Sequence, residues 1–168
     1  MPGEYIVVDL FKQRMTAIHE RIAAAARRAS RDPAEVQCVV VTKTHPVETI
    51  QQLLAAGVTH LGENRIQEAA HKIDALAHAR EHITWHLIGH VQRNKAKNAV
   101  GLFDIIHSLD SVRLAETLDQ QYAKRVQAAH PAVSASSASE NCLPVLLQVN
   151  VSGEASKEGF SLPGGVEN

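Results

Sequence analysis

The feature that most constrains the fold of this chain is the alternation of short β-branched runs with amphipathic stretches. The runs that indicate strands lie at residues 37–42 (QCVVVT), 58–61, 83–88, 103–109 and 144–151. Helical spacing of apolar residues is found at residues 11–30, 46–56, 63–79, 92–100 and 111–129. Strands that alternate with helices in this way form a parallel sheet with helical crossovers, so an α/β fold is expected.

Two architectures fit this pattern, a doubly wound open sheet and a (β/α)8 TIM-type barrel. A complete barrel takes about 250 residues, whereas the chain has 168. If the fold is a barrel, it is therefore expected to be incomplete, with an N-terminal helix followed by about five parallel strands. We expect a single domain over residues 1–168, in which the Ser/Ala-rich residues 131–141 (PAVSASSASEN) form a flexible surface loop.

Composition argues against several classes of protein. The formal net charge of −1 provides no excess of positive charge for binding nucleic acid, and the short basic stretch at residues 92–97 has no interleaved aromatic residues. No stretch is apolar enough for a membrane span, and two cysteines without CxxC spacing favour a reducing, cytoplasmic compartment. The GxGxxG, GxxxxGK[ST] and GxSxG motifs are absent, which removes the usual support for a dinucleotide, a nucleoside triphosphate or a serine hydrolase.

Ten histidines raise the question of a metal site. His78 and His82 could share a helical face, but His86 and His90 straddle the end of a predicted strand. No HExxH pattern and no CxxC paired with HxxxH occurs in the sequence. We therefore expect solvated or hydrogen-bonded histidines and no metal.

Polar residues follow the predicted strands at their carboxyl ends, where ligands bind in both architectures. Lys43 follows the first strand, and the apolar run before it predicts a low-dielectric setting that favours a neutral amine able to attack an aldehyde. The alternative is a lysine that simply reaches solvent. The corresponding candidates at the other four strands are Asn64, His86, Ser108, Gln148 and Asn150, and Asp110 also follows the fourth strand.

Two of these candidates have competing interpretations. Gly62-Glu63-Asn64 could be a tight turn in which Glu63 or Asn64 caps the next helix, or Asn64 could offer hydrogen bonds to a ligand. Trp85 and His86 alternate in direction along one strand, so only one of them can face a barrel interior or sheet crevice, where His86 could act as an acid or base.

Five segments in this order resemble the pyridoxal phosphate homeostasis protein family, whose fold is that of the alanine racemase N-terminal domain. They are VVVTKTHPVETIQQLLAAG, HLGENRIQEAAHKI, ITWHLIGHVQRNKAK, FDIIHSLDSVRLAETL and VLLQVNVSGEASKEGF, and the resemblance covers the chain from about residue 5 to about residue 160. The resemblance implies pyridoxal 5'-phosphate (PLP) as cofactor, held as a Schiff base on Lys43. It also implies a pocket lined or supported by Gly62, Glu63, Asn64, Trp85, His86, Ile88, Gly89, Gln92, Asn94 and Lys95.

The resemblance further implies a carrier that binds PLP and hands it over, with PLP-dependent apo-enzymes as candidate partners and no established reaction. The residues agree, because racemisation needs a base on each face of the substrate and no second one is identifiable beside Lys43. A Schiff-base lysine enzyme and a remnant without ligand binding are the alternatives. Family members continue through three more strand–helix units that supply the phosphate cup, and an incomplete barrel exposes two strand edges through which the chain could self-associate.

Overall fold

The structure is a computed structural model that describes residues 2–129 and 142–161, and it contains a five-stranded parallel sheet. The strands are β1 (Val40–Val41), β2 (His60–Glu63), β3 (Thr84–Leu87), β4 (Ile105–Leu109) and β5 (Val145–Leu147), and they lie side by side in chain order. A doubly wound sheet reverses its strand order, whereas consecutive neighbours are the arrangement of a barrel wall. The strand order therefore decides between the two architectures in favour of the incomplete barrel.

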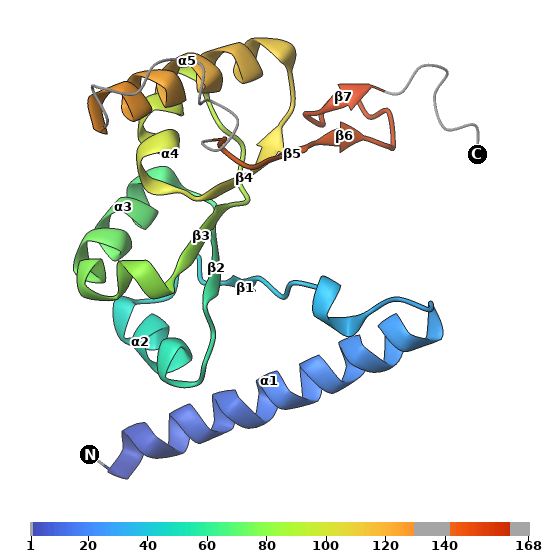
Figure 1. Ribbon diagram of the computed structural model, residues 1–168, viewed down its shortest axis with the longest axis vertical. Helices are drawn as coiled ribbons and strands as arrows, with labels where there is room; N and C mark the ends of the chain where they lie inside the picture. Colours follow the sequence, from blue (N-terminus) through green and yellow to red (C-terminus); the bar gives the residue numbers. More distant parts are fainter. Residues whose placement is uncertain (1, 130–141, 162–168) are drawn as a thin grey trace.

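Helices cover one side of this sheet. The helices are α1 (Pro2–Arg28), α2 (Val47–Ala55), α3 (Ile66–Ala75), α4 (Ala96–Leu102) and α5 (Val112–Ala129), with short 3-10 turns η1 (Pro33–Glu35), η2 (Ala77–His82) and η3 (Arg93–Lys95). Figure 1 shows α2, α3 and α4 on the same side of the strands, with α5 packed on α4 and α1 lying beside α2 at the opposite end. No helix among residues 2–129 or 142–161 is long and apolar enough to cross a membrane.

The core lies between the sheet and these helices. Leu61, Trp85, Leu87 and Ile106 are fully buried strand residues of this core, which packs against buried residues of α2 to α5. Because side chains alternate along a strand, His86 lies on the opposite face from Trp85. The sequence prediction that only one of this pair faces the barrel interior is thus confirmed, and the residue on that face is His86.

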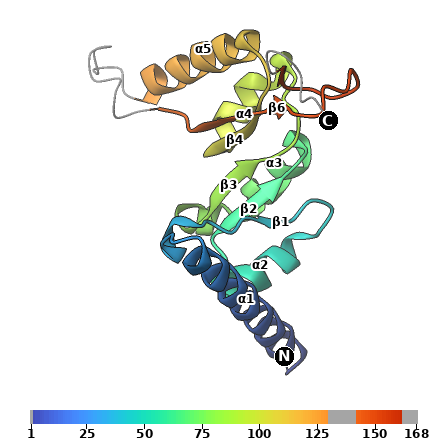
Figure 2. The same ribbon diagram turned by 90° about the vertical axis from the view of Figure 1, so that its right-hand side faces the viewer.

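The predicted fifth strand over residues 144–151 is wrong as a single element. The backbone N–H of Gln148 donates to Leu109 O, at 2.8 Å, while Gln148 O accepts from Phe160 N–H, also at 2.8 Å. The chain therefore changes its pairing partner at Gln148, so that β5 pairs with β4 and β6 (Val149–Asn150) pairs in parallel with β7 (Phe160–Ser161). Figure 2 shows β6 next to the end of β4.

Other predicted boundaries are also wrong, among them those of the first strand and of the helix expected over residues 63–79. The first strand is limited to β1 instead of residues 37–42, because its partner β2 begins only at His60, and Val40 already pairs with Leu61. The helix expected over residues 63–79 starts later, because Glu63 belongs to β2 and pairs with Leu87. The residue at the N-cap of α3 is Arg65, and no side-chain hydrogen bond caps the helix. Glu63 and Asn64 therefore do not cap α3.

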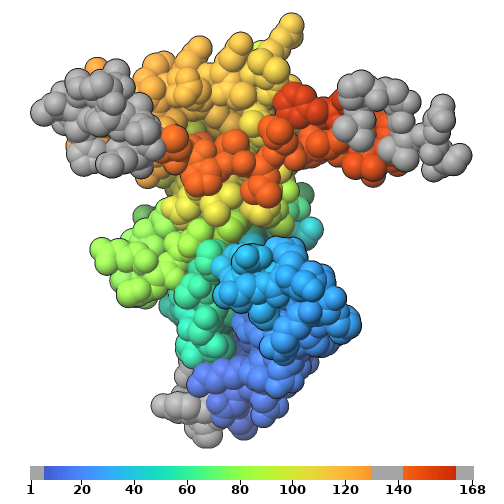
Figure 3. Space-filling view, turned by 45° about the vertical axis from the view of Figure 1, so that its right-hand side comes forward, coloured from blue at the N-terminus to red at the C-terminus, as the bar shows by residue number. Residues whose placement is uncertain are grey.

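The side chains of the two edge strands are more exposed than those of the central strands. β1 and β5 are the edge strands, and the apolar side chains of β5 are exposed, as is Val41 of β1. Figure 3 shows the orange and red residues of β5 to β7 spread over the surface. The expected loop at residues 131–141 lies outside the described residues.

Candidate functional site

A buried ion pair joins the carboxyl ends of β1 and β2 to α3. Lys72 Nζ lies 2.8 Å from Glu63 Oε1, and the two side chains are 6% and 0% exposed. The same ammonium donates to Thr42 O at 2.9 Å and to Glu68 Oε1 at 2.7 Å. Thr42 Oγ1 in turn donates to Glu63 Oε1 at 2.6 Å. One lysine on α3 therefore fixes the backbone immediately before Lys43.

The backbone immediately after Lys43 is fixed by the same network. Thr44 has a positive φ of 65°, unusual for a β-branched residue. Its N–H donates to Glu68 Oε1 at 2.6 Å, which compensates for this conformation. The hydrogen bond from Lys72, followed by the one from Thr44 N–H, lowers the pKa of Glu68, so the carboxylate stays charged and keeps accepting both.

Lys43 itself lies in the turn between these fixed points. Its residue is exposed, and its amine makes no hydrogen bond or ion pair with the residues that the structure describes. The described residues therefore do not enclose Lys43 in the low-dielectric setting that the sequence predicts. The structure instead presents an amine that has no partner among the described residues, on a backbone that hydrogen bonds hold on both sides.

Three histidines form a hydrogen-bonded chain on the open face of the sheet. His60 Nδ1 lies 2.9 Å from His86 Nε2, and His86 Nδ1 lies 2.9 Å from His107 Nε2. The three residues come from β2, β3 and β4, and the register pairs His86 with Gly62 and Ile105. A neutral imidazole has one donor and one acceptor, so three neutral rings can satisfy both hydrogen bonds.

The middle histidine of this chain is held neutral. Burial, followed by the neighbouring His107 and His60 rings, lowers the pKa of His86 to about 4. Burial also lowers the pKa of His107. The protein therefore keeps the imidazoles of His86 and His107 neutral at neutral pH, which suits hydrogen bonding to a ligand better than a positive charge would.

Asn64 and Ser108 both lie against Gly89. A Cβ at Gly89 would lie 2.2 Å from Asn64 O, so only glycine permits this close approach of the turns after β2 and β3. The Ser108 hydroxyl donates to Gly89 O at 2.6 Å, which holds the same turn from β4. Asn64 and Lys43 each lie two residues beyond the register pair Val41–Gly62, so they come at the same level of the sheet.

Gln148 and Asn150 are placed differently from the other candidates. Gln148 Nε2 donates to Glu158 O at 3.0 Å, and Asn150 Nδ2 donates to Glu154 O at 2.9 Å. Asn150 Oδ1 accepts from Gly153 N–H at 3.0 Å. Both amides thus shape the segment between β6 and β7, whereas the other four candidates lie at the ends or on the open face of β1 to β4.

Sequence reasoning missed Lys72, His60 and His107. The helical spacing offered one sign for Lys72, because it lies three residues after Ala69 and four before Leu76, both fully buried. A charged residue at such a position is buried only when it has a partner. No spacing rule links His60 with His107, because their contact with His86 depends on strand register.

Residues 14–165 match the family model for the alanine racemase N-terminal domain. The chain belongs to this family. It is 35% identical over 155 residues to a pyridoxal phosphate homeostasis protein of Vibrio alginolyticus, a match that covers 89% of this chain and 59% of the relative. It is 38% identical over 147 residues to the protein of that name from Pseudomonas aeruginosa, covering 88% and 57%.

A solved structure of a relative contains the cofactor. PipY of Synechococcus elongatus with PLP bound is 37% identical to this chain and superposes with a TM-score of 0.60, covering 85% of this chain and 57% of PipY. The chain thus spans about three fifths of the length of these relatives. The fold expected from the five matched segments is confirmed.

Removing the Lys72 ammonium is expected to destabilise the protein strongly. In Lys72→Met the Glu63 carboxylate stays buried without its partner, which costs about 3–5 kcal/mol. Urea unfolding of wild type, Lys72→Met and Lys97→Met measures this loss. Lys97 is exposed on α4, so its substitution should leave the free energy of unfolding within about 0.5 kcal/mol of wild type. Equal stability of the two variants would contradict the structural role of the pair.

Stability is expected to fall on acidification through the titration of His86. Its folded pKa of about 4 lies below the ordinary value of 6.5, so the unfolded chain binds the proton first. The contribution of neutral His86 to the free energy of unfolding is complete above pH 6.5 and is lost as the pH falls to 4. Its upper limit is about 3 kcal/mol. Urea unfolding across this range should show a flatter pH slope for His86→Gln than for wild type, with a variant of an exposed histidine, His78→Gln, measured alongside as the control.

Proposed function

We propose that this chain binds PLP, with the cofactor held as a Schiff base on Lys43. Lys43 would hold the cofactor through a C=N bond that replaces the C=O bond of the PLP aldehyde, and the aldehyde oxygen would leave as water. The observation that carries the proposal is the Lys43 amine, which has no partner among the described residues and follows a backbone held on both sides by the Lys72 network, in a fold shared with PLP-bound PipY. The bound cofactor would supply an electron-withdrawing ring.

The polar groups around Lys43 fit such a ligand. Asn64 lies at the level of Lys43, and neutral His86 lies on the open face two strands away. We propose that these two residues, with Ser108, Gln148 and Asn150, surround the cofactor site. Ser108, Gln148 and Asn150 would act chiefly through the backbone turns that they hold, because their side chains already bind main-chain groups.

We propose a carrier of PLP in the cytoplasm, with apo-enzymes as recipients, in preference to a racemase. The carboxylates in the network next to Lys43, Glu63 and Glu68, are both bound by Lys72 Nζ. Neither is therefore available as a second proton-transfer group. A Schiff-base lysine enzyme remains the alternative, and it requires turnover that disappears with Lys43.

Borohydride reduction tests the cofactor proposal. The chain incubated with PLP should turn yellow and, after reduction, carry one pyridoxyl group on Lys43 by peptide mass analysis. Lys43→Ala should lose this label and the upward shift of Tm that PLP produces, since only a ligand that prefers the folded state stabilises it. Lys97→Ala is the matched control.

Labelling spread over several lysines, or equal labelling of Lys43→Ala, would refute the site. A chain that folds cooperatively but shows neither colour nor a Tm shift would favour the remnant without ligand binding.

We also propose that the chain associates with itself through its exposed strand edges. Leu147 of β5 is 65% exposed, and Val41 of the other edge strand is 43% exposed. Unpaired edges with apolar side chains are templates for pairing. Sedimentation velocity should show a dimer or larger species for wild type and a shift to monomer for Leu147→Lys. A wild-type monomer at high micromolar concentration would exclude this proposal.

A further inference from the structure

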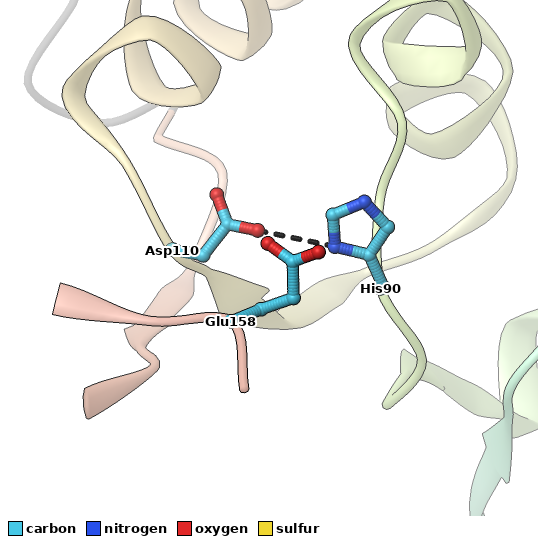
Figure 4. A group of neighbouring side chains, drawn as sticks. All are labelled: His90, Asp110 and Glu158. Atoms are coloured by element: carbon cyan, nitrogen blue, oxygen red, sulfur yellow. Dashed lines mark ion pairs between the residues drawn. The ribbon is translucent and has the colours of Figure 1, made fainter. Parts of the chain in front are cut away.

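Three side chains with metal-ligand chemistry converge at the carboxyl ends of β3 and β4. His90 follows β3, Asp110 follows β4, and Glu158 comes two residues before β7. One nitrogen or oxygen atom from each lies within 4.8 Å of the other two. Figure 4 shows the three side chains directed toward one another from three separate segments. Their spacing in the sequence resembles no metal motif, which is why sequence analysis predicted no metal.

Asp110 provides the second observation. Its side chain is only 8% exposed, and its Oδ2 atom is buried and accepts no hydrogen bond from the described residues. A buried carboxylate oxygen without a donor is costly. Such an atom in a native fold calls for a water or an ion beside it.

The contact between Asp110 and His90 has the geometry of two ligands. His90 Nδ1 lies 3.1 Å from Asp110 Oδ2, yet the contact lacks hydrogen-bond geometry. Two ligand atoms bound at 2.0–2.1 Å to one cation, at angles between octahedral and tetrahedral, lie roughly 2.9–3.4 Å apart. The observed separation falls in this range, so the nitrogen and the oxygen already lie as neighbours around one ion would.

We propose that His90, Asp110 and Glu158 bind a divalent cation of the zinc class. An imidazole nitrogen favours Zn²⁺ over Mg²⁺ and Ca²⁺, which prefer oxygen ligands alone. Glu158 is exposed, so its side chain can rotate to complete the set. Three protein ligands leave one position of a tetrahedral ion open for water or for a ligand oxygen.

The cation would connect the two sheets of the protein. His90 and Asp110 belong to segments of the five-stranded sheet, whereas Glu158 belongs to the segment that leads into β7 of the two-stranded sheet. Gln148 and the Glu158 carbonyl already make one link between these parts, at 3.0 Å. A bound ion adds a second link through the Glu158 side chain. This inference does not depend on PLP, and its test contains none.

Zinc binding to the metal-free full chain tests the proposal. Calorimetric titration with ZnCl2 should show one site more in wild type than in Asp110→Asn, and Tm should rise by about 5 °C at a hundredfold excess over Kd. His90→Asn and Glu158→Gln should weaken zinc binding tenfold or more. MgCl2 at the same concentration should produce no Tm shift.

Two control variants separate this site from the other histidines and acids. Glu154→Gln changes an exposed carboxylate in the same segment as Glu158, and His19→Asn changes an exposed histidine on α1. Both should bind zinc as wild type does. Because Glu158 is exposed, Glu158→Gln should keep the metal-free Tm, so its loss of zinc binding cannot reflect misfolding. Zinc binding by Glu158→Gln or Asp110→Asn equal to wild type would overturn the proposal.

Discussion

The placement of Lys43 depends on the buried ion pair between Lys72 and Glu63. Two charges removed from water cost several kcal/mol each, and their attraction offsets this only when further hydrogen bonds complete the site. Here the Lys72 ammonium has three acceptors, from the residue that follows β1, from β2 and from its own helix α3. The network satisfies the lysine and at the same time fixes the two residues that flank Lys43. A hydrophobic pair could fill the same volume, but it could not hold Thr42 O.

The two faces of the sheet are stabilised by different interactions. Towards the helices, Leu61, Trp85 and Ile106 are buried in an apolar core, which gives the sheet its stability. On the open face, His60, His86 and His107 bind one another, and burial keeps the pKa of His86 low. A charged ring there would gain little, because its neighbours are also imidazoles. His86 is therefore polar without being charged at neutral pH.

The sequence predicted the order and type of the elements because hydrophobic period and helix ends are local properties. The predictions failed where partners distant in the sequence decide the outcome. Gln148 breaks the fifth strand because Leu109 and Phe160 pair with its two backbone groups. Glu63 is a buried strand residue because Lys72 reaches it from α3. Asp110, His90 and Glu158 meet only after three segments have been folded together, so no spacing rule finds them.

Lys43 and the proposed cation site lie apart at the carboxyl ends of the strands. Lys43 follows β1, whereas Asp110 follows β4, three strands along the sheet. Neighbouring strands lie about 4.8 Å apart, so the separation along the sheet is roughly 14 Å. A cation bound to Asp110 would thus not touch the Lys43 amine. Loss of the zinc site should therefore leave the Lys43 amine intact.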